Sequence, residues 1–78
     1  MDERLFFPAT QRNKDCIGDL LSEVLPSSGS VLEIGSGSGE HGVIFQKRFP
    51  KIMWQTSDPE LIHRKSIRAW IESQKLTE

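Results

Sequence analysis

The chain has 78 residues, of which 36% are apolar and 27% charged, and its formal net charge is −1. This composition fits one small globular domain, and the near-neutral charge does not favour nucleic acid or an acidic membrane as a partner. The single cysteine excludes an internal disulfide framework and a cysteine zinc cluster, and no apolar run approaches the roughly 20 residues that cross a bilayer.

Residues 1–9 are predicted to form an arm, because no helical or strand period is visible in them. A helix is predicted over 10–25, with Thr10 as its N-cap and Pro26 directly after its end. Its apolar residues recur at i, i+3, i+4, i+7 and i+8, which is typical of an amphipathic helix; they are Ile17, Leu20, Leu21, Val24 and Leu25. Cys16 borders this stripe, and we expect it to be a small core residue.

A strand and a helix follow on either side of a glycine-rich loop. The strand is predicted over 31–34, where β-branched residues gather, and the helix over 41–49. The helix offers Val43, Ile44 and Phe49 for burial, and its last turn carries two cations, which suit the negative end of the helix dipole.

A second strand and a third helix complete the chain. The strand is predicted over 52–57 from its alternating side chains, and the helix from Asp58, as a capping residue, to about residue 74. The apolar face of this helix is predicted at Ile67, Trp70 and Ile71, and its polar side at Arg64, Lys65 and Arg68. Trp54 and Trp70 are expected to be core aromatics, and His63 a surface residue.

The order helix, strand, helix, strand, helix predicts an α/β fold with parallel strands joined by right-handed crossovers. Its glycine loop, between the first strand and the following helix, then lies at the carboxyl end of the sheet, where open α/β sheets bind ligands. Glycines there permit positive φ angles and let a ligand approach the backbone without meeting a Cβ.

Two registers of the loop are possible. Gly37-x-Gly39-x-x-Gly42 matches the dinucleotide fingerprint, but the strand would have to extend further than its sequence suggests to meet Gly37. Glu33-x-Gly35-x-Gly37-x-Gly39 places its first glycine directly after the strand. The acid before it suits a cationic ligand group and would repel a pyrophosphate, so we favour this second register.

Asp58 follows the second strand and provides a second acid at the same edge of the sheet. A carboxylate in this place can accept hydrogen bonds from the hydroxyls of a ribose. The alternative is that Asp58 only caps the last helix. Together with the loop, it predicts half of a site for a nucleoside ligand.

The Glu33-to-Gly39 loop followed by a strand ending in Asp58 resembles motif I and the next acidic position of class I S-adenosyl-L-methionine (SAM)-dependent methyltransferases. The segments FFPATQRNKDCI, VLEIGSGSGEHG, WQTSDPE and SIRAWI resemble, more closely, successive segments of the "domain of unknown function 938" family, also called methyltransferase-like. The resemblance covers almost the whole chain but only the N-terminal part of the family's domain. Thr56 stands where the family usually has a proline.

The resemblance implies a SAM site and a Rossmann-like fold. In it, Gly35, Gly37 and Gly39 shape the loop under the methionine part of SAM, Glu33 lies near its amino group, and Asp58 holds the ribose. Ser36, Ser38 and His41 line the loop and the start of the helix, and Arg12 and Asn13 close over the ligand. S-adenosylhomocysteine is the implied product.

The length of the chain limits these implications. A class I methyltransferase sheet has seven strands, whereas two are predicted here, so residues 10–78 are interpreted as a truncated SAM-binding half-domain that lacks the substrate half. Catalytic residues and the methyl acceptor cannot be assigned, and the short chain is expected to be inactive alone.

Three alternatives for function and partner remain. The chain is completed by a missing C-terminal half, or it is a non-catalytic interaction module that forms a homodimer through open sheet edges, or it is an NAD-type dinucleotide-binding half. In each case we expect an intracellular, cytoplasmic protein without a metal site or membrane partner.

Overall fold

A computed structural model describes residues 2–74, so the end of the predicted 10–78 unit, residues 75–78, lies outside the described residues. Three helices and two strands follow one another along the chain, in the order α1 (Pro8–Val24), β1 (Gly29–Leu32), α2 (Glu40–Arg48), β2 (Ile52–Gln55) and α3 (Leu61–Ser73). The predicted order and the α/β class are confirmed. Each element lies within a few residues of its predicted range.

The two strands run parallel in an open sheet, with Val31 aligned with Trp54 and Leu32 with Gln55. The pairing continues beyond the strands, because Glu33 N–H donates to the carbonyl of Gln55 at 2.8 Å. The segments that follow β1 and β2 therefore leave the sheet at the same edge.

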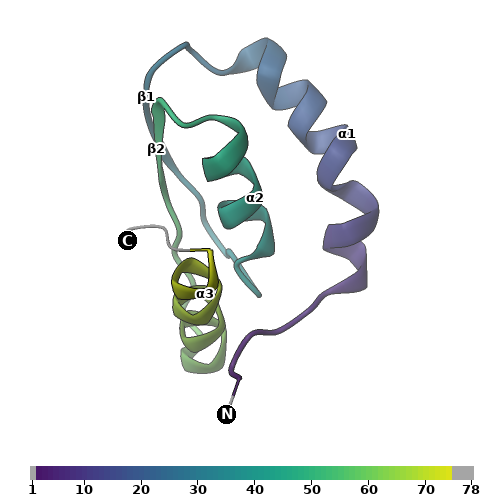
Figure 1. Cartoon of the computed structure of the whole chain (residues 1–78), viewed down its shortest axis with the longest axis vertical. Coiled ribbons are helices and arrows are strands. Elements are labelled where there is room, and N and C mark those ends of the chain that lie inside the picture. The colour runs from purple at the N-terminus through teal and green to yellow at the C-terminus, as the bar shows by residue number, and fades with distance from the viewer. Residues whose placement is uncertain (1, 75–78) are drawn as a thin grey trace.

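Helix α2 lies between the sheet and α1, and α3 lies at the lower end of the molecule in Figure 1, near the start of the chain. The core is centred on α2, where Phe45 and Val43 are 2% and 5% exposed. Ile52 and Ile67 are also buried, from β2 and α3. The sequence correctly predicted burial of Val43 and Ile67 but did not identify Phe45, the most deeply buried apolar side chain.

Helix α1 begins two residues earlier than predicted, at Pro8, and Thr10 is not its N-cap. Proline suits the first helical position because its missing N–H would have no partner there. Thr10 is instead buried in the first turn, where its N–H donates to the carbonyl of Phe7 at 3.0 Å.

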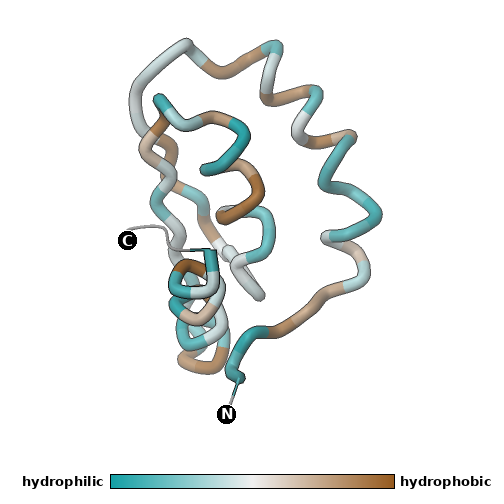
Figure 2. Tube along the Cα trace, in the orientation of Figure 1, coloured by the Kyte–Doolittle hydropathy of each residue, from teal (hydrophilic) through white to brown (hydrophobic). Residues whose placement is uncertain are grey.

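The predicted apolar stripe of α1 is largely uncovered. Leu20 and Val24 are 59% and 64% exposed, and Cys16, expected in the core, is exposed as well. After its first turn, the buried residue of α1 is Gly18, which packs against Arg48 of α2. Figure 2 shows hydrophobic and hydrophilic stretches alternating along α1. The second half of α1 is thus amphipathic in sequence, but no other element of the described chain covers most of its apolar side chains.

One face of the sheet is also exposed. Side chains alternate along a strand, so Leu32 and Met53 lie on the face opposite Trp54, which contacts Phe45 of α2. Leu32 and Met53 are 63% and 69% exposed, and neighbouring Ile34 is 77% exposed. Within residues 2–74, no helix has the length and apolar character needed to cross a membrane.

Candidate ligand-binding site

The glycine loop between β1 and α2 uses its three glycines in different ways. Gly35, Gly37 and Gly39 all have positive φ angles, of 67°, 60° and 92°, which L side chains rarely adopt. A Cβ at Gly39 would lie 2.8 Å from the Cα of Ile67, so this glycine allows α3 to approach. A Cβ at Gly35 would meet no atom within 4 Å. The loop is therefore open at Gly35 and closely packed at Gly39.

Several backbone N–H groups of the loop are already bound within the chain. Ser36 N–H donates to the carbonyl of Ser57 at 2.8 Å, and Gly39 N–H to the carbonyl of Ser36 at 3.2 Å. Gly37 N–H donates to Oδ2 of Asp58 at 2.9 Å. These donors cannot also cradle a phosphate without giving up their present partners.

Asp58 joins the glycine loop to the turn before α3. Its Oδ1 accepts hydrogen bonds from Glu60 N–H at 2.9 Å and from the ring of His63 at 3.0 Å, in addition to the Gly37 bond on Oδ2. The N–H groups of Glu60 and Gly37, and then His63, hold the pKa of Asp58 below its ordinary value. Its side chain is 6% exposed. Because α3 begins only at Leu61, Asp58 closes the preceding turn and is not the helix N-cap that we predicted.

His63 was predicted to be a surface residue, but it is only partly exposed and contacts Asp58. Its side chain is 27% exposed, and Nδ1 lies 3.0 Å from Oδ1 of Asp58. Because the ionised Asp58 carboxylate can only accept hydrogen bonds, Nδ1 of His63 carries the proton. In the neutral ring, Nε2 is then an acceptor.

The acid before the loop, Glu33, lies at the end of β1 and is half-buried. Its Oε1 accepts a hydrogen bond from Nε1 of Trp54 at 3.2 Å, and its carbonyl accepts one from the hydroxyl of Ser57 at 2.6 Å. Ser57 N–H also donates to Oγ of Ser36 at 2.8 Å. These hydrogen bonds tie the segment after β1 to the segment after β2.

Ser38 and Glu40 form a buried polar cluster where the loop enters α2. The hydroxyl of Ser38 donates to Oε1 of Glu40 at 2.8 Å, and its carbonyl accepts a hydrogen bond from the hydroxyl of Ser66 at 2.6 Å. Glu40 is only 1% exposed. The sequence analysis did not select Glu40 or Ser66. An acid in the first turn of a helix is a recognisable signal, but it does not predict burial.

The remaining predicted site residues lie further from the loop or face elsewhere. His41 stacks on Phe45 with ring centroids 5.2 Å apart, and its buried Nε2 has no hydrogen-bond partner within the described part of the chain. Arg12 and Asn13 are exposed on α1. Their neighbour Gln11 reaches the loop instead, because its amide donates to Oε2 of Glu40 at 2.9 Å.

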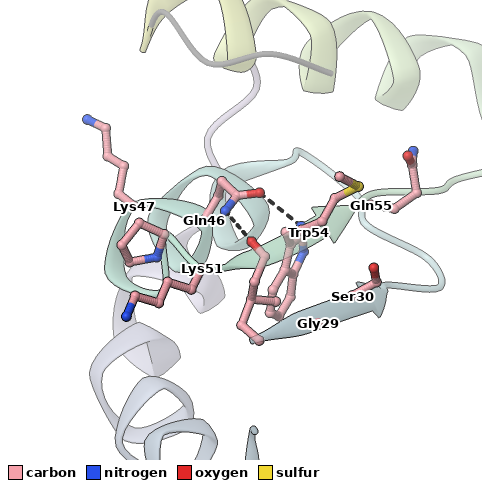
Figure 3. Close-up of a pocket in the computed structure, with 10 residues that line it drawn as sticks. Gly29, Ser30, Gln46, Lys47, Lys51, Trp54 and Gln55 are labelled. Atoms are coloured by element: carbon pink, nitrogen blue, oxygen red, sulfur yellow. Dashed lines mark hydrogen bonds between the residues drawn. The ribbon is translucent and has the colours of Figure 1, made fainter. Parts of the chain in front are cut away.

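A separate depression of about 610 Å³ lies along the outer edge of β2. Figure 3 shows the amide of Gln46 beside the β2 backbone, where it donates to the carbonyl of Ile52 at 2.6 Å and accepts from Trp54 N–H at 2.9 Å. No residue of the 35–39 loop lines this depression. Both polar atoms of the Gln46 side chain already bind the strand backbone. We therefore favour the 35–39 loop over this depression as the candidate ligand site.

The model of the family described as "Protein of unknown function (DUF938)" matches residues 4–78. No solved structure matches the chain.

Proposed function

The chain belongs to the DUF938 family, and on this premise we propose that its glycine loop binds SAM, as one part of the cofactor site of a methyltransferase-like protein. The observation that carries the proposal is the opening at Gly35. Gly35 has a positive φ angle and free space around it. The strand before it ends at Leu32, two residues earlier than predicted, so the Glu33 carboxylate directly follows the strand and Gly35 comes two residues later. A ligand can reach the backbone there and meet an acid.

The acids of the site suit a cation better than a pyrophosphate. SAM carries an ammonium group and a sulfonium group, and Glu33 is the acid placed to attract the ammonium group. A pyrophosphate would need free N–H donors, but Gly37 N–H already binds the Asp58 carboxylate. These contacts weigh against the NAD-type alternative.

Asp58 is proposed to bind the ribose, but its carboxylate can accept few further hydrogen bonds. A carboxylate offers about four acceptor sites, and three hydrogen bonds from the chain already use Asp58. We therefore expect it to accept from one ribose hydroxyl, through Oδ2, rather than from both. Its larger role is to hold the loop in the open shape.

When bound, SAM supplies an electrophilic methyl group; the residues of this chain bind and orient it. Enzymes that transfer groups in this way depend on positioning and a matched electrostatic environment. Glu33 and Gly35 contribute to both, and the loop carries no assigned nucleophile or general base.

Calorimetric titration with SAM, S-adenosylhomocysteine and NAD tests the proposal. We expect both adenosyl ligands to bind and NAD to give no heat. Gly35→Ala should weaken S-adenosylhomocysteine binding about tenfold or more, because the new Cβ fills the approach and the positive φ is strained. Gly29→Ala is the matched control, since Gly29 also has a positive φ, 135°, but lies at the start of β1.

The proposal fails if the folded protein gives no heat with either adenosyl ligand at millimolar concentration. Equal losses of affinity in the Gly35 and Gly29 variants would also contradict it, because the effect would then come from backbone strain alone. Binding of NAD in place of the adenosyl ligands would favour the dinucleotide register.

A second candidate function is an interaction module. The exposed sheet face with Leu32 and Met53, and the neighbouring Ile34, favours it, because contiguous exposed apolar groups mark many association surfaces. This function does not require the loop to bind a ligand, and self-association in solution distinguishes it.

A further inference from the structure

Side chains of α2 and α3 hold the backbone of the N-terminal arm, defined here as residues 2–7. Leu5 N–H donates to the hydroxyl of Ser66 at 2.8 Å, and the carbonyl of Leu5 accepts a hydrogen bond from Nε1 of Trp70 at 2.9 Å. Phe7 N–H donates to Oε1 of Glu40 at 2.6 Å. In Figure 1 the arm passes close to α3 before it enters α1. The arm is therefore docked through its main chain.

Side chains of the arm add to this docking. The ring of Phe6 packs edge-on against Trp70, with centroids 5.1 Å apart, and the guanidinium of Arg4 lies 5.1 Å from the Trp70 ring centroid. Such ring and cation contacts add to the hydrogen bonds of an extended segment. They keep the arm in one place relative to α3.

Glu40 joins the arm to the glycine loop through its carboxylate. Its carboxylate accepts hydrogen bonds from Phe7 N–H, from the amide of Gln11 and from the hydroxyl of Ser38, and all three donors are uncharged. A buried carboxylate is costly unless its hydrogen bonds are made. Two of the three donors come from the arm and the first turns of α1, so Glu40 is satisfied only while the arm is docked.

The docked arm covers one side of the loop. The Phe7 ring lies 3.1 Å from where a Cβ of Gly37 would stand, and it meets the ring of His63 edge-on with centroids 5.8 Å apart. The Phe7 ring thus covers the loop at Gly37 and beside His63. At Gly35, by contrast, a Cβ would meet no atom within 4 Å.

We propose that Glu40 is a positioning residue that latches the arm onto the glycine loop, and that the latched arm forms a wall of the ligand site, so that the ligand approaches from the Gly35 side. The latch follows from the contacts of Glu40 alone. The role of the arm as a wall rests on the proposed function, because it concerns the ligand.

Amide hydrogen exchange of Phe7 in the full chain measures the latch. Gln11→Glu replaces a donor by a second carboxylate beside Oε2 of Glu40, and we expect Phe7 N–H to exchange about 10- to 100-fold faster, because hydrogen bonds to a charged acceptor are worth that much. Cys16→Glu is the control, since it adds the same charge at an exposed position of the same helix.

A second substitution should restore the latch. In the double variant Gln11→Glu with Glu40→Gln, the amide at position 40 can donate to the new carboxylate, and its oxygen can still accept from Phe7 N–H and Ser38. We expect exchange at Phe7 to return to within about threefold of the original chain. Unchanged exchange in Gln11→Glu, or no recovery in the double variant, would overturn the latch.

Titration with S-adenosylhomocysteine, on the same variants, tests the wall. Gln11→Glu should lower the affinity about tenfold, by the energy of a lost charged hydrogen bond, and the double variant should recover it. If exchange at Phe7 becomes faster while the affinity stays unchanged, the arm does not form a wall of the ligand site, although Glu40 still holds the arm. If the original chain binds no adenosyl ligand, the proposed function and the wall both fail, and the exchange series still decides the latch.

Discussion

At the scale of single residues, Gly39 and Gly35 differ in what surrounds them, although both have positive φ angles. A Cβ at Gly39 would lie 2.8 Å from the Cα of Ile67, which is backbone and cannot rotate away, whereas a Cβ at Gly35 meets open space. We predict that Gly35→Ala lowers the free energy of unfolding by about 1 kcal/mol, from strain alone, and Gly39→Ala by more than about 2 kcal/mol. Urea unfolding of both variants measures the difference. Equal losses would show that α3 does not depend on Gly39.

The pH dependence of stability reports on Asp58. Hydrogen bonds from Glu60 and Gly37 hold the pKa of its folded form below the ordinary 3.8. A group with a lowered folded pKa stabilises the protein above its unfolded pKa, and the contribution is lost as the pH falls through the folded pKa. We predict that the melting temperature drops below about pH 4 and that Asp58→Asn flattens this drop.

Asp2→Asn is the comparison for this acid limb. Hydrogen bonds from Arg4 lower the pKa of Asp2 to about 2, but both side chains are substantially exposed, so solvent screens their interaction. We expect Asp2→Asn to change the melting curves much less than Asp58→Asn between pH 3 and pH 6, roughly the range of carboxylate titration. The reverse order would show that the arm, and not the glycine loop, controls acid sensitivity.

Sequence reasoning located single residues where the order of the elements determines their position. Gly35 and Asp58 follow strands, so the α/β order alone places them at one edge of the sheet. The sequence could not predict the contacts of Glu40 or His63. Glu40 binds Phe7 only because the arm folds back onto the loop, and His63 meets Asp58 only because of the shape of the turn between β2 and α3. The pattern marks helix ends and strand ends, whereas tertiary hydrogen bonds leave no periodic signal.

At the scale of the elements, β2 has an outer edge that the side chain of Gln46 occupies. The amide of Gln46 donates to the carbonyl of Ile52 and accepts from Trp54 N–H, two bonds of the kind that a neighbouring strand makes. We predict that Gln46→Ala lowers the free energy of unfolding by about 1–2 kcal/mol, because both backbone groups lose their partner. Exchange at Trp54 N–H should also become faster.

Gln55→Ala is the matched control for Gln46→Ala. The Gln55 side chain is an exposed amide on the same strand, and it donates a hydrogen bond to the carbonyl of the next residue, Thr56, at 3.0 Å. We expect it to leave both the unfolding free energy and exchange at Trp54 nearly unchanged. A similar loss in the two variants would mean that Gln46 does not cap the edge.

The elements themselves were predictable, and their exact ends less so. Proline at position 8 and the long run of helix-compatible residues after it start α1 before Thr10, because Pro8 is well suited to a first turn. The apolar period of α1 correctly indicated a helix but not its burial. Burial depends on a neighbour, and α2, with which α1 packs, has 9 residues against 17 in α1.

At the scale of the whole molecule, two strands and three helices enclose a core made mainly around α2. Small domains bury a smaller share of their apolar surface than large ones. Here the consequence is visible on the sheet, where Leu32 and Met53 are mostly exposed while Phe45 on the other side is 2% exposed. The sheet has a covered face and a bare face, and the exposed apolar residues of the bare face form a surface that can associate with another copy of the chain.

Self-association through the bare face is the final prediction. Leu32→Lys with Met53→Lys replaces two exposed apolar groups on that face by charges. If the face associates, the original chain should sediment as a dimer at high concentration and the double variant as a monomer, because like charges would have to be brought together. Stability should change by less than about 1 kcal/mol, as for surface substitutions. Leu20→Lys with Val24→Lys, at similarly exposed positions of α1, is the control and should leave the dimer intact. A monomer for the original chain at every concentration would contradict association, and the interaction module would then lose its supporting observation.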